Sequence, residues 1–431
     1  MDHLQAWEKY KDLTYDDLPE DVVKVASQCI LDWFGCAIAG STEPLSEILR
    51  EVFGHRAGTC TVIGSELKLD AQTAALLNGA SGHALDYDDT GAKTHCHSTA
   101  PVIPAALAIA EEIGASGKQM ITAFVVGVEI EGRIAHAMGG DHYARGWHTT
   151  ATYGAFGATA AVAHILRLEK EQYAIAMGLA ASHASGVKAN FGTMTKPYHP
   201  GHSAESGITS AKLAAAGYTA NPDAVMGNQG FITAASTVDD PKERLSRVAD
   251  DWMILGTLFK YHAACHLTHS AIESLMKLST SLDVEDLSNV TITVHPGLLD
   301  VCGIPEPKTG LEGKFSLRGT ASLALNGIDT GNPGTFVDEV IGSEVVQKLI
   351  EKVSIETDTS LSNFQSKIVW IDKEQKAYEV FNDLSEPVSD YEEQGRKLEQ
   401  KFISLCEFAG SDAVVMRPKI RSLLDAETVT L

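Results

Sequence analysis

Alanine and glycine fill the apolar segments of the first 250 residues, and this feature constrains the fold more than any other. In the segment TTATYGAFGATAAVAHILRL (Thr149–Leu168), apolar residues recur at helical spacing and most of them are small. Small side chains let neighbouring helices approach one another closely. The sequence therefore predicts a compact, all-helical domain in this part of the chain.

Residues 19–40 show how the individual helices are predicted. Pro19 and Glu20 favour the start of a helix, Gly40 favours its end, and the apolar residues between them recur at helical spacing. The same reasoning predicts helices at 70–85, 101–114, 117–138, 150–167, 170–185 and 203–217. Before residue 250, only the short run TCTVIG (Thr59–Gly64) resembles a strand.

The sequence pattern changes after about residue 285. NVTITVHP (Asn289–Pro296) alternates β-branched and polar residues, as a half-buried strand does. KVSIET (352–357) and KIVWIDKEQKAYEVF (367–381) follow the same pattern, and the second predicts a hairpin that turns at Asp372–Gln375. Helical segments are expected at 314–327, at 344–352 and in the last 40 residues.

These patterns together predict a mainly α fold with two domains, because 431 residues are many for one hydrophobic core. We expect a large all-helical domain formed by 1–258 and 392–431. A smaller α+β lid domain at 259–391 would be inserted before the C-terminal helices. No uninterrupted apolar run of 18 or more residues stands out, so a membrane-spanning helix is not expected.

The formal net charge of −23 argues against nucleic acids and anionic membranes as partners. The N-terminal segment MDHLQAWEKYKDLTYDDLPED is acidic and polar, unlike a signal peptide. The seven cysteines are odd in number, widely scattered and without a CxxC motif, so neither a zinc module nor a disulfide framework is indicated. We therefore expect a cytoplasmic protein with reduced thiols.

Ionisable residues gather between two apolar segments in SGHALDYDDTGAKTHCHSTAPVIPA (Ser81–Ala105). If the helix from Asp70 continues through Asp86, then Asp86, Asp89 and Thr90 share one of its faces. Mutual repulsion and burial would raise the proton affinity of at least one carboxyl, which makes this group a candidate general acid or base. The alternative is a charged helix end in which Lys93 pairs with Asp89.

The histidines His95 and His97 follow these carboxylates and allow two readings. His and Asp are good metal ligands, but HxH without a third patterned ligand is a weak signal for a metal. Thr99 and Pro101 open the next helix, so the histidines lie just before a helix N-terminus, which is suited to binding anions. We expect no metal.

Three further segments carry residues of the same chemical types. GWHTTATYGAFG (Gly146–Gly157) offers His148 and Tyr153, each of which also suits a packed position. A Gly/Pro-rich loop leading into a helix supplies Lys196, His199 and His202, and the predicted domain junction supplies Lys260, His262, His266 and His269. Carboxylates, imidazoles and lysines together suit proton transfer next to a carboxylate, with cations stabilising the enediolate that forms.

Four motifs, in the same order, resemble the MmgE/PrpD family: DYDDT with HCHSTAPVIPAALA, then GWHTTATYGAFGATAA, KANFGTMTKPYHPGHSAESG and FKYHAACHLTH. The family includes 2-methylcitrate dehydratase, cis- and trans-aconitate decarboxylases and iminodisuccinate epimerase. The resemblance implies a homodimer, a large helical domain with a smaller α+β lid domain, and no metal or organic cofactor.

The resemblance also implies a set of site residues. The resemblance places Asp86, Thr90, His97, His148, Lys196, Lys260 and His266 in the pocket. Of these we expect Asp86, Thr90, His97 and Lys196 to be catalytic, and we add Tyr153 as a candidate proton-transfer phenol. The residues that would bind substrate carboxylates are His148, Lys196, Lys260 and His266. His97 is preferred to His95 because of its distance from Pro104.

We therefore expect a cofactor-independent lyase that acts on a small di- or tricarboxylate, either by dehydrating a 2-methylcitrate-type substrate or by decarboxylating an aconitate. Two alternatives stay open. Tyr153 and Lys196 on opposite faces of a substrate would suit an epimerase of an iminodisuccinate-like dicarboxylate. A non-catalytic carboxylate-binding protein is the second alternative, although binding alone does not require clustered carboxylates.

Overall fold

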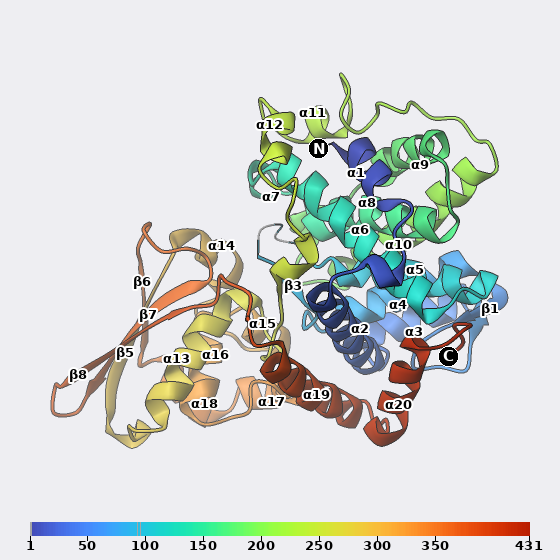
Figure 1. Cartoon of the computed structure of the whole chain (residues 1–431). Helices are drawn as coiled ribbons and strands as arrows, with labels where there is room; N and C mark the ends of the chain where they lie inside the picture. Colours follow the sequence, from blue (N-terminus) through green and yellow to red (C-terminus); the bar gives the residue numbers. More distant parts are fainter. Residues whose placement is uncertain (1, 93, 95) are drawn as a thin grey trace. The chain divides into compact units, whose positions relative to one another are not determined.

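The computed structural model describes residues 2–92, 94 and 96–431, and these form two compact units. The helical unit contains the chain up to Ala84, Asp88–Phe259 and Val388–Leu431, and the α+β unit contains Leu85–Tyr87 and Lys260–Pro387. The predicted mainly α fold is confirmed (Figure 1). The domain boundaries expected from the sequence, with 259–391 as a lid domain, stay a prediction.

The described part of the helical unit consists mainly of helices and contains two pairs of short strands. Its helices are α1 (His3–Tyr10), α2 (Glu20–Gly40), α3 (Pro44–Phe53), α4 (Ala71–His83), α5 (Thr99–Ile113), α6 (Gly117–Met138), α7 (Asp141–Ala144), α8 (Thr149–Ile165), α9 (Lys170–His183), α10 (Thr195–Ala215), α11 (Phe231–Ala235), α12 (Pro241–Ser246), α19 (Tyr391–Phe408) and α20 (Ala413–Leu424). The strands β1 (Ala57–Thr61) and β2 (Lys68–Leu69) form one antiparallel pair, and β3 (Thr90–Gly91) and β4 (Thr257–Leu258) form another.

Close helix packing in this unit depends on glycine, as the composition predicted. A Cβ atom added to Gly79 of α4 would lie 2.8 Å from the Cα of Gly201 in α10. One added to Gly127 of α6 would lie 2.7 Å from the carbonyl oxygen of Gly157 in α8. Neither contact is tolerable in a packed interior, so these two helix pairs require glycine at their crossings.

Among the described helices, α2 is long and apolar enough to cross a membrane by length and composition, with a mean hydropathy of 1.4. The sequence pattern alone predicted no such segment. In the structure, 78% of the apolar window is buried inside the protein. This burial accounts for the composition of α2, because a core helix is apolar on most of its faces.

The predicted helices are confirmed, with two corrections that concern functional residues. α10 begins at Thr195, eight residues before the predicted start, so Lys196 and His199 lie in a helix and not in a loop. Pro197 lies in the first turn, where proline is tolerated, and the helix continues through Pro200. α4 ends at His83, so the helical face expected for Asp86, Asp89 and Thr90 does not exist.

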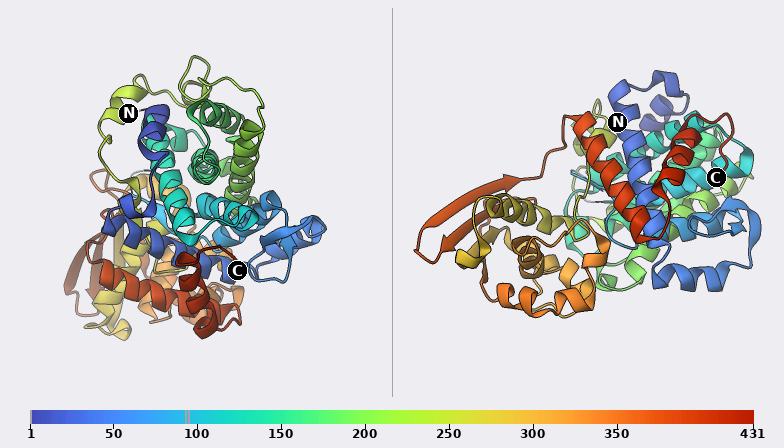
Figure 2. Two further views of the ribbon diagram at one scale, coloured as in Figure 1. Left: turned by 45° about the vertical axis from the view of Figure 1, so that its right-hand side comes forward. Right: turned by 90° about the horizontal axis from the view of Figure 1, so that it is seen from below.

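The α+β unit is built around one four-stranded sheet in the order β6–β5–β7–β8. The strands are β5 (Leu287–Val294), β6 (Val353–Thr357), β7 (Gln365–Asp372) and β8 (Ala377–Asp383). β5 and β6 are parallel, and the other two pairs are antiparallel. The hairpin predicted at 367–381 is confirmed as β7 and β8, which Figure 2 shows in orange-red at the edge of this unit.

Helices supply the rest of the α+β unit. They are α13 (His269–Ser279), α14 (Leu299–Cys302), α15 (Gly310–Lys314), α16 (Leu317–Leu325), α17 (Asp338–Ile341) and α18 (Glu344–Ile350). α13 and α16 pack against the sheet and share its apolar core with Val290, Ile368 and Trp370. β5 alternates buried and more accessible residues along part of its length, as its sequence predicted.

A buried ion pair joins α19 to α2. Lys401 Nζ of α19 lies 2.6 Å from Asp32 Oδ1 of α2, and both side chains are almost fully buried. A second ion pair, between Lys24 and Glu392, joins the same two helices but is largely exposed to solvent. The two ion pairs therefore differ mainly in how completely their charged groups are removed from water.

We predict that Lys401→Met lowers the free energy of unfolding by about 3–5 kcal/mol, because it removes the cation that faces a buried carboxylate. The double variant Asp32→Leu/Lys401→Met should recover most of this loss. The control Lys24→Met should change the free energy by less than about 1 kcal/mol. Urea unfolding of the four proteins measures all three values, and equal losses in the two single variants would contradict the prediction.

Candidate functional site

The segment between α4 and α5 carries the ionisable residues that the sequence singled out. Its described residues form turns and the short strand β3 between two buried helices, and Asp86, Asp88 and Asp89 are all buried. Asp86 adopts a left-handed backbone conformation with φ of 52°. This conformation is uncommon for residues other than glycine and reverses the chain directly after α4. The turn brings Asp88 back beneath the end of α4.

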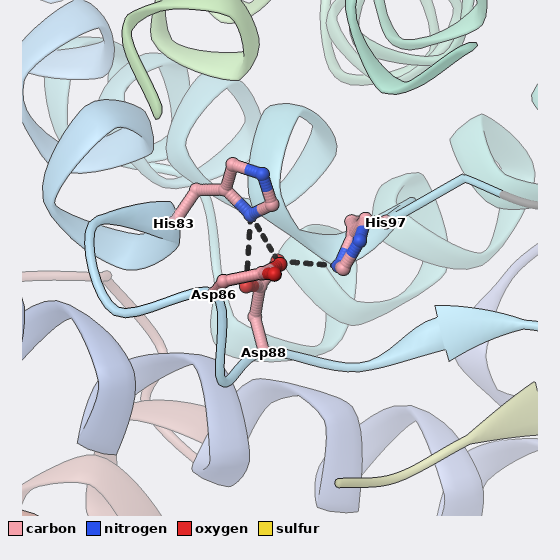
Figure 3. Close-up of side chains that lie close together, drawn as sticks. All are labelled: His83, Asp86, Asp88 and His97. Carbon is pink, nitrogen blue, oxygen red and sulfur yellow. Dashed lines mark hydrogen bonds and ion pairs between the residues drawn. The ribbon is translucent and has the colours of Figure 1, made fainter. Parts of the chain in front are cut away.

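Asp88 lies between two imidazoles (Figure 3). His83 Nδ1 lies 2.8 Å from Asp88 Oδ1 and 3.0 Å from Oδ2, and His97 Nδ1 lies 3.2 Å from Oδ2. The backbone N–H of His97 donates to Thr150 Oγ1 at 3.0 Å, which fixes this part of the turn against α8. Neither His83 nor Asp88 was among the site residues predicted from the sequence, although both lie in the segment Ser81–Ala105.

Burial acts to raise the pKa of Asp88, but the His83 and His97 imidazoles outweigh it and hold the pKa well below its usual range. Burial lowers the pKa of His83 to about 4, although Asp88 opposes this shift. At neutral pH an ionised Asp88 therefore accepts a hydrogen bond from Nδ1–H of a neutral His83. The Asp88 carboxylate therefore carries a negative charge inside the helical unit, where its oxygens contact the His83 and His97 rings.

Two more histidines, His148 and His199, lie close to His83 or to one another. The ring of His148, directly before α8, lies 5.9 Å from the ring of His83, and its Nδ1 lies 2.9 Å from Nδ1 of His199 in α10. One of these two nitrogens must carry the hydrogen that the other accepts. Burial holds the pKa of His148 well below its usual value and lowers the pKa of His199 to about 4.

Lys196 belongs to the same part of the helical unit. Its positive charge contributes to the low pKa values of His83 and His148. Its Nζ lies 5.3 Å from the ring centre of Phe191, and the same ring meets His148 edge-on at 4.9 Å. The structure thus brings three predicted site residues, His97, His148 and Lys196, together around His83 and Asp88. We refer to these five residues as the imidazole cluster.

The other predicted residues of the helical unit lie beside this cluster or apart from it. Thr90 is buried in β3 and donates from Oγ1 to the carbonyl oxygen of Cys96 at 3.3 Å. Tyr153 packs its ring against His142 at 5.2 Å, and burial raises its pKa. His142 in turn stacks on Trp147, so Tyr153 belongs to a packed group of rings.

Three predicted site residues lie in the α+β unit. Lys260 Nζ lies 3.0 Å from Asp86 Oδ1 and 2.5 Å from the Asp86 carbonyl oxygen, and its side chain is almost fully buried. The ring of His266 lies 4.8 Å from that of His269 and 5.3 Å from that of Phe364. The structure thus pairs Asp86 with Lys260. The alternatives that involved Lys93 or His95 concern residues outside the described part of the chain.

Two buried carboxyl groups lie next to the turn and retain their protons more strongly than usual. Burial raises the pKa of Asp89 to about 7, although a hydrogen bond from Thr99 opposes the shift. Burial raises the pKa of Glu131 in α6 to about 8, although hydrogen bonds with the Cys96 and Ser98 side chains oppose the shift. The raised proton affinity expected in this region thus occurs at Asp89. Glu131 was not identified, although a carboxylate inside the apolar run FVVGVEIEGRIA signals burial.

We predict that Glu131→Gln removes part of the pH dependence of stability. An unfolded Glu has a pKa of about 4.3, so between about pH 5 and pH 7.5 the folded protein holds a proton that the unfolded chain has lost. Stability from this group is complete below pH 4.3 and declines as the pH rises towards 8, by about 1.4 kcal/mol per pH unit. Glu131→Gln should lack this slope.

Urea unfolding at about pH 5.5, 6.5 and 7.5 tests this prediction. The exposed Glu171 supplies the control, Glu171→Gln, which should keep the slope of the unchanged protein. Identical slopes for Glu131→Gln and the unchanged protein would show that Glu131 titrates alike in the folded and unfolded states.

Comparison with known proteins adds independent evidence. A family model described as the MmgE/PrpD N-terminal domain matches residues 7–244, and one described as the MmgE/PrpD C-terminal domain matches residues 262–425. The two matches extend over most of the chain, in the order that the sequence motifs indicated.

Individual relatives agree with these matches. The chain is 30% identical over 339 residues to a cis-aconitate decarboxylase of Aspergillus terreus (strain NIH 2624 / FGSC A1156), covering 73% of this chain and 69% of the relative. It is 30% identical to the cis-aconitate decarboxylase-like protein oryM of Aspergillus oryzae (strain ATCC 42149 / RIB 40), with coverage of 80% and 77%. A cis-aconitate decarboxylase of Homo sapiens is 26% identical, with coverage of 79% and 73%. The chain belongs to the MmgE/PrpD family.

Proposed function

We propose that this protein is a lyase that removes carbon dioxide from a cis-aconitate-type tricarboxylate without a metal or organic cofactor. The observation that carries the proposal is the imidazole cluster, found in a chain whose relatives include cis-aconitate decarboxylases. Dehydration of a 2-methylcitrate-type hydroxy acid is the related activity that the first experiment must separate from decarboxylation.

The chemistry of decarboxylation explains why imidazoles and a lysine would be needed. The bond between the departing carboxyl group and its carbon breaks, and its electron pair moves into the adjacent C=C–carboxylate system. The resulting dienolate takes up one proton on carbon, so that a tricarboxylate and a proton give a dicarboxylate and CO₂. A cation stabilises the developing negative charge, and an acid delivers the proton.

The residues of the imidazole cluster suit these roles. We assign proton delivery to His97, the partly accessible imidazole held by Asp88. Lys196 and His148 would bind substrate carboxylates, with Lys196 also stabilising the dienolate. Thr90 would support the turn that carries His97. Asp86, Lys260 and His266 stay proposed site residues of the α+β unit, where Lys260 and His266 would bind carboxylates.

An epimerase receives less support from the structure than a lyase does. That reading needed Tyr153 as a second base, but the Tyr153 ring packs against His142 and burial raises its pKa. A phenol with a raised pKa is a poor base at neutral pH. We therefore leave Tyr153 out of the proposed acid–base groups. A homodimer in the cytoplasm completes the proposal, and the seven cysteines are buried thiols, as a reducing compartment allows.

Proton NMR in D₂O with the pure protein tests the proposed reaction. Separate samples would contain cis-aconitate, trans-aconitate, 2-methylcitrate and iminodisuccinate. Decarboxylation of an aconitate, with one solvent deuterium placed on carbon in the product, supports the proposal. Loss of water from 2-methylcitrate would favour the dehydratase, exchange of an α-proton without elimination would favour the epimerase, and binding without turnover would favour the carboxylate-binding protein.

We predict that His97→Ala lowers kcat at least about 100-fold, because general acid catalysis typically contributes 10²–10⁴-fold. The exposed His55 provides the control variant His55→Ala, which should keep full activity. Steady-state kinetics on the substrate identified by NMR measures both values. Full turnover by a folded His97→Ala protein would remove His97 from the mechanism.

We predict that Asp88→Asn lowers kcat about 10-fold or more with a smaller change in KM. The carboxylate does not reach the substrate in this proposal, but it holds the His97 and His83 rings. An amide can keep one of these contacts and cannot supply the charge. A change confined to KM would instead assign Asp88 to substrate binding.

A further inference from the structure

His83, Asp88 and His97 have the donor atoms and the spacing of a metal site. One ligand atom from each residue can be chosen so that all of them lie within 4.8 Å of one another. His83 Nδ1 lies 2.8 Å from Asp88 Oδ1, and His97 Nδ1 lies 3.2 Å from Asp88 Oδ2. Tetrahedral zinc with bonds of about 2.0–2.1 Å places its ligand atoms about 3.3 Å apart.

We propose that His83, Asp88 and His97 form a binding site for a zinc-like divalent transition-metal ion, and that the bound ion inhibits the enzyme. All three donors belong to the helical unit and converge from the end of α4 and from the turn that follows it (Figure 3). The ion would take the position between the three side chains, with a water molecule as its fourth ligand.

The donor set determines which ions fit. Two imidazole nitrogens and one carboxylate oxygen favour zinc, copper, nickel and cobalt, whereas magnesium and calcium prefer oxygen ligands. His83 and Asp88 are fully buried and His97 is 14% exposed, so little water competes with the three protein ligands. On binding, His83 keeps one proton but carries it on Nε2, which frees the Nδ1 lone pair for the metal.

Inhibition follows from the role given to His97 and therefore rests on the proposed function. A metal ion on His97 Nδ1 holds the ring in place and makes it a poorer carrier of the catalytic proton. The same ion neutralises Asp88, which otherwise holds the two imidazoles. Binding of the ion requires neither role, so the two parts of the proposal can be tested separately.

Metal binding is tested on the full chain after chelator treatment. Equilibrium dialysis should give one Zn²⁺ per chain, and Co²⁺ should show the intense visible absorption of a tetrahedral site. Asp88→Asn and His83→Gln should each weaken binding at least about 10-fold, because each loses one of three protein ligands. The control His202→Ala removes a partly exposed histidine that faces Glu205 at 3.5 Å and should bind as the unchanged protein does.

Two results would overturn the metal site. One is the absence of stoichiometric Zn²⁺ binding. The other is equal binding by Asp88→Asn, His83→Gln and the unchanged protein, which would place the ion elsewhere. Using two variants guards against the failure of either one to fold, and circular dichroism identifies a variant that is not folded.

Activity measured with and without Zn²⁺ tests the inhibitory role. The expected result is loss of at least nine-tenths of the turnover at saturating Zn²⁺, with recovery when a chelator is added. An active enzyme that binds one Zn²⁺ and keeps or gains activity would overturn inhibition. If one Zn²⁺ binds at these residues but no carboxylate is converted in any sample, the proposed function fails while the metal site stands.

Discussion

The charge of Asp88, buried in the helical unit, is the interaction on which the candidate site depends. A carboxylate without exposure to water is costly unless its oxygens are hydrogen-bonded. His83 and His97 place ring nitrogens within 3.2 Å of the Asp88 oxygens, and both contacts depend on the turn that directly follows α4. The left-handed conformation of Asp86 reverses the chain in this turn. The backbone conformation of Asp86 and the position of the Asp88 carboxylate are therefore linked.

Close helix packing sets the positions of the remaining imidazoles. Because Gly79 and Gly201 let α4 and α10 almost touch, the C-terminal end of α4 lies near the first turns of α10. His83 ends the first of these helices and His199 lies in the second, with His148 near both. Larger residues at the glycine positions would separate the helices and with them the imidazoles. The small-residue composition thus determines the geometry of the site as well as the fold.

Much of the fold and part of the site could be predicted from the sequence. Helices such as 117–138 and the hairpin at 367–381 follow from periodicity, which is a local property. The start of α10 could not be predicted, because Pro200 is a local signal against a helix that packing on α4 outweighs. Residue types identified His97, His148 and Lys196 as candidates, but the pairing of Asp88 with His83 depends on a reversal of the chain that no periodicity encodes.

Asp88 and Asp89 show most clearly why the sequence alone could not assign chemistry here. They are adjacent, equally buried and identical in type, yet the pKa of Asp88 lies well below its usual range and that of Asp89 is raised to about 7. The difference comes from their partners, since Asp88 faces two imidazoles and Asp89 faces a threonine hydroxyl. Asp88 therefore contacts His83 and His97, whereas Asp89 contacts Thr99 in the first turn of α5. Two neighbouring carboxyl groups of one short segment thus differ in chemistry, because one stays ionised and the other retains its proton more strongly.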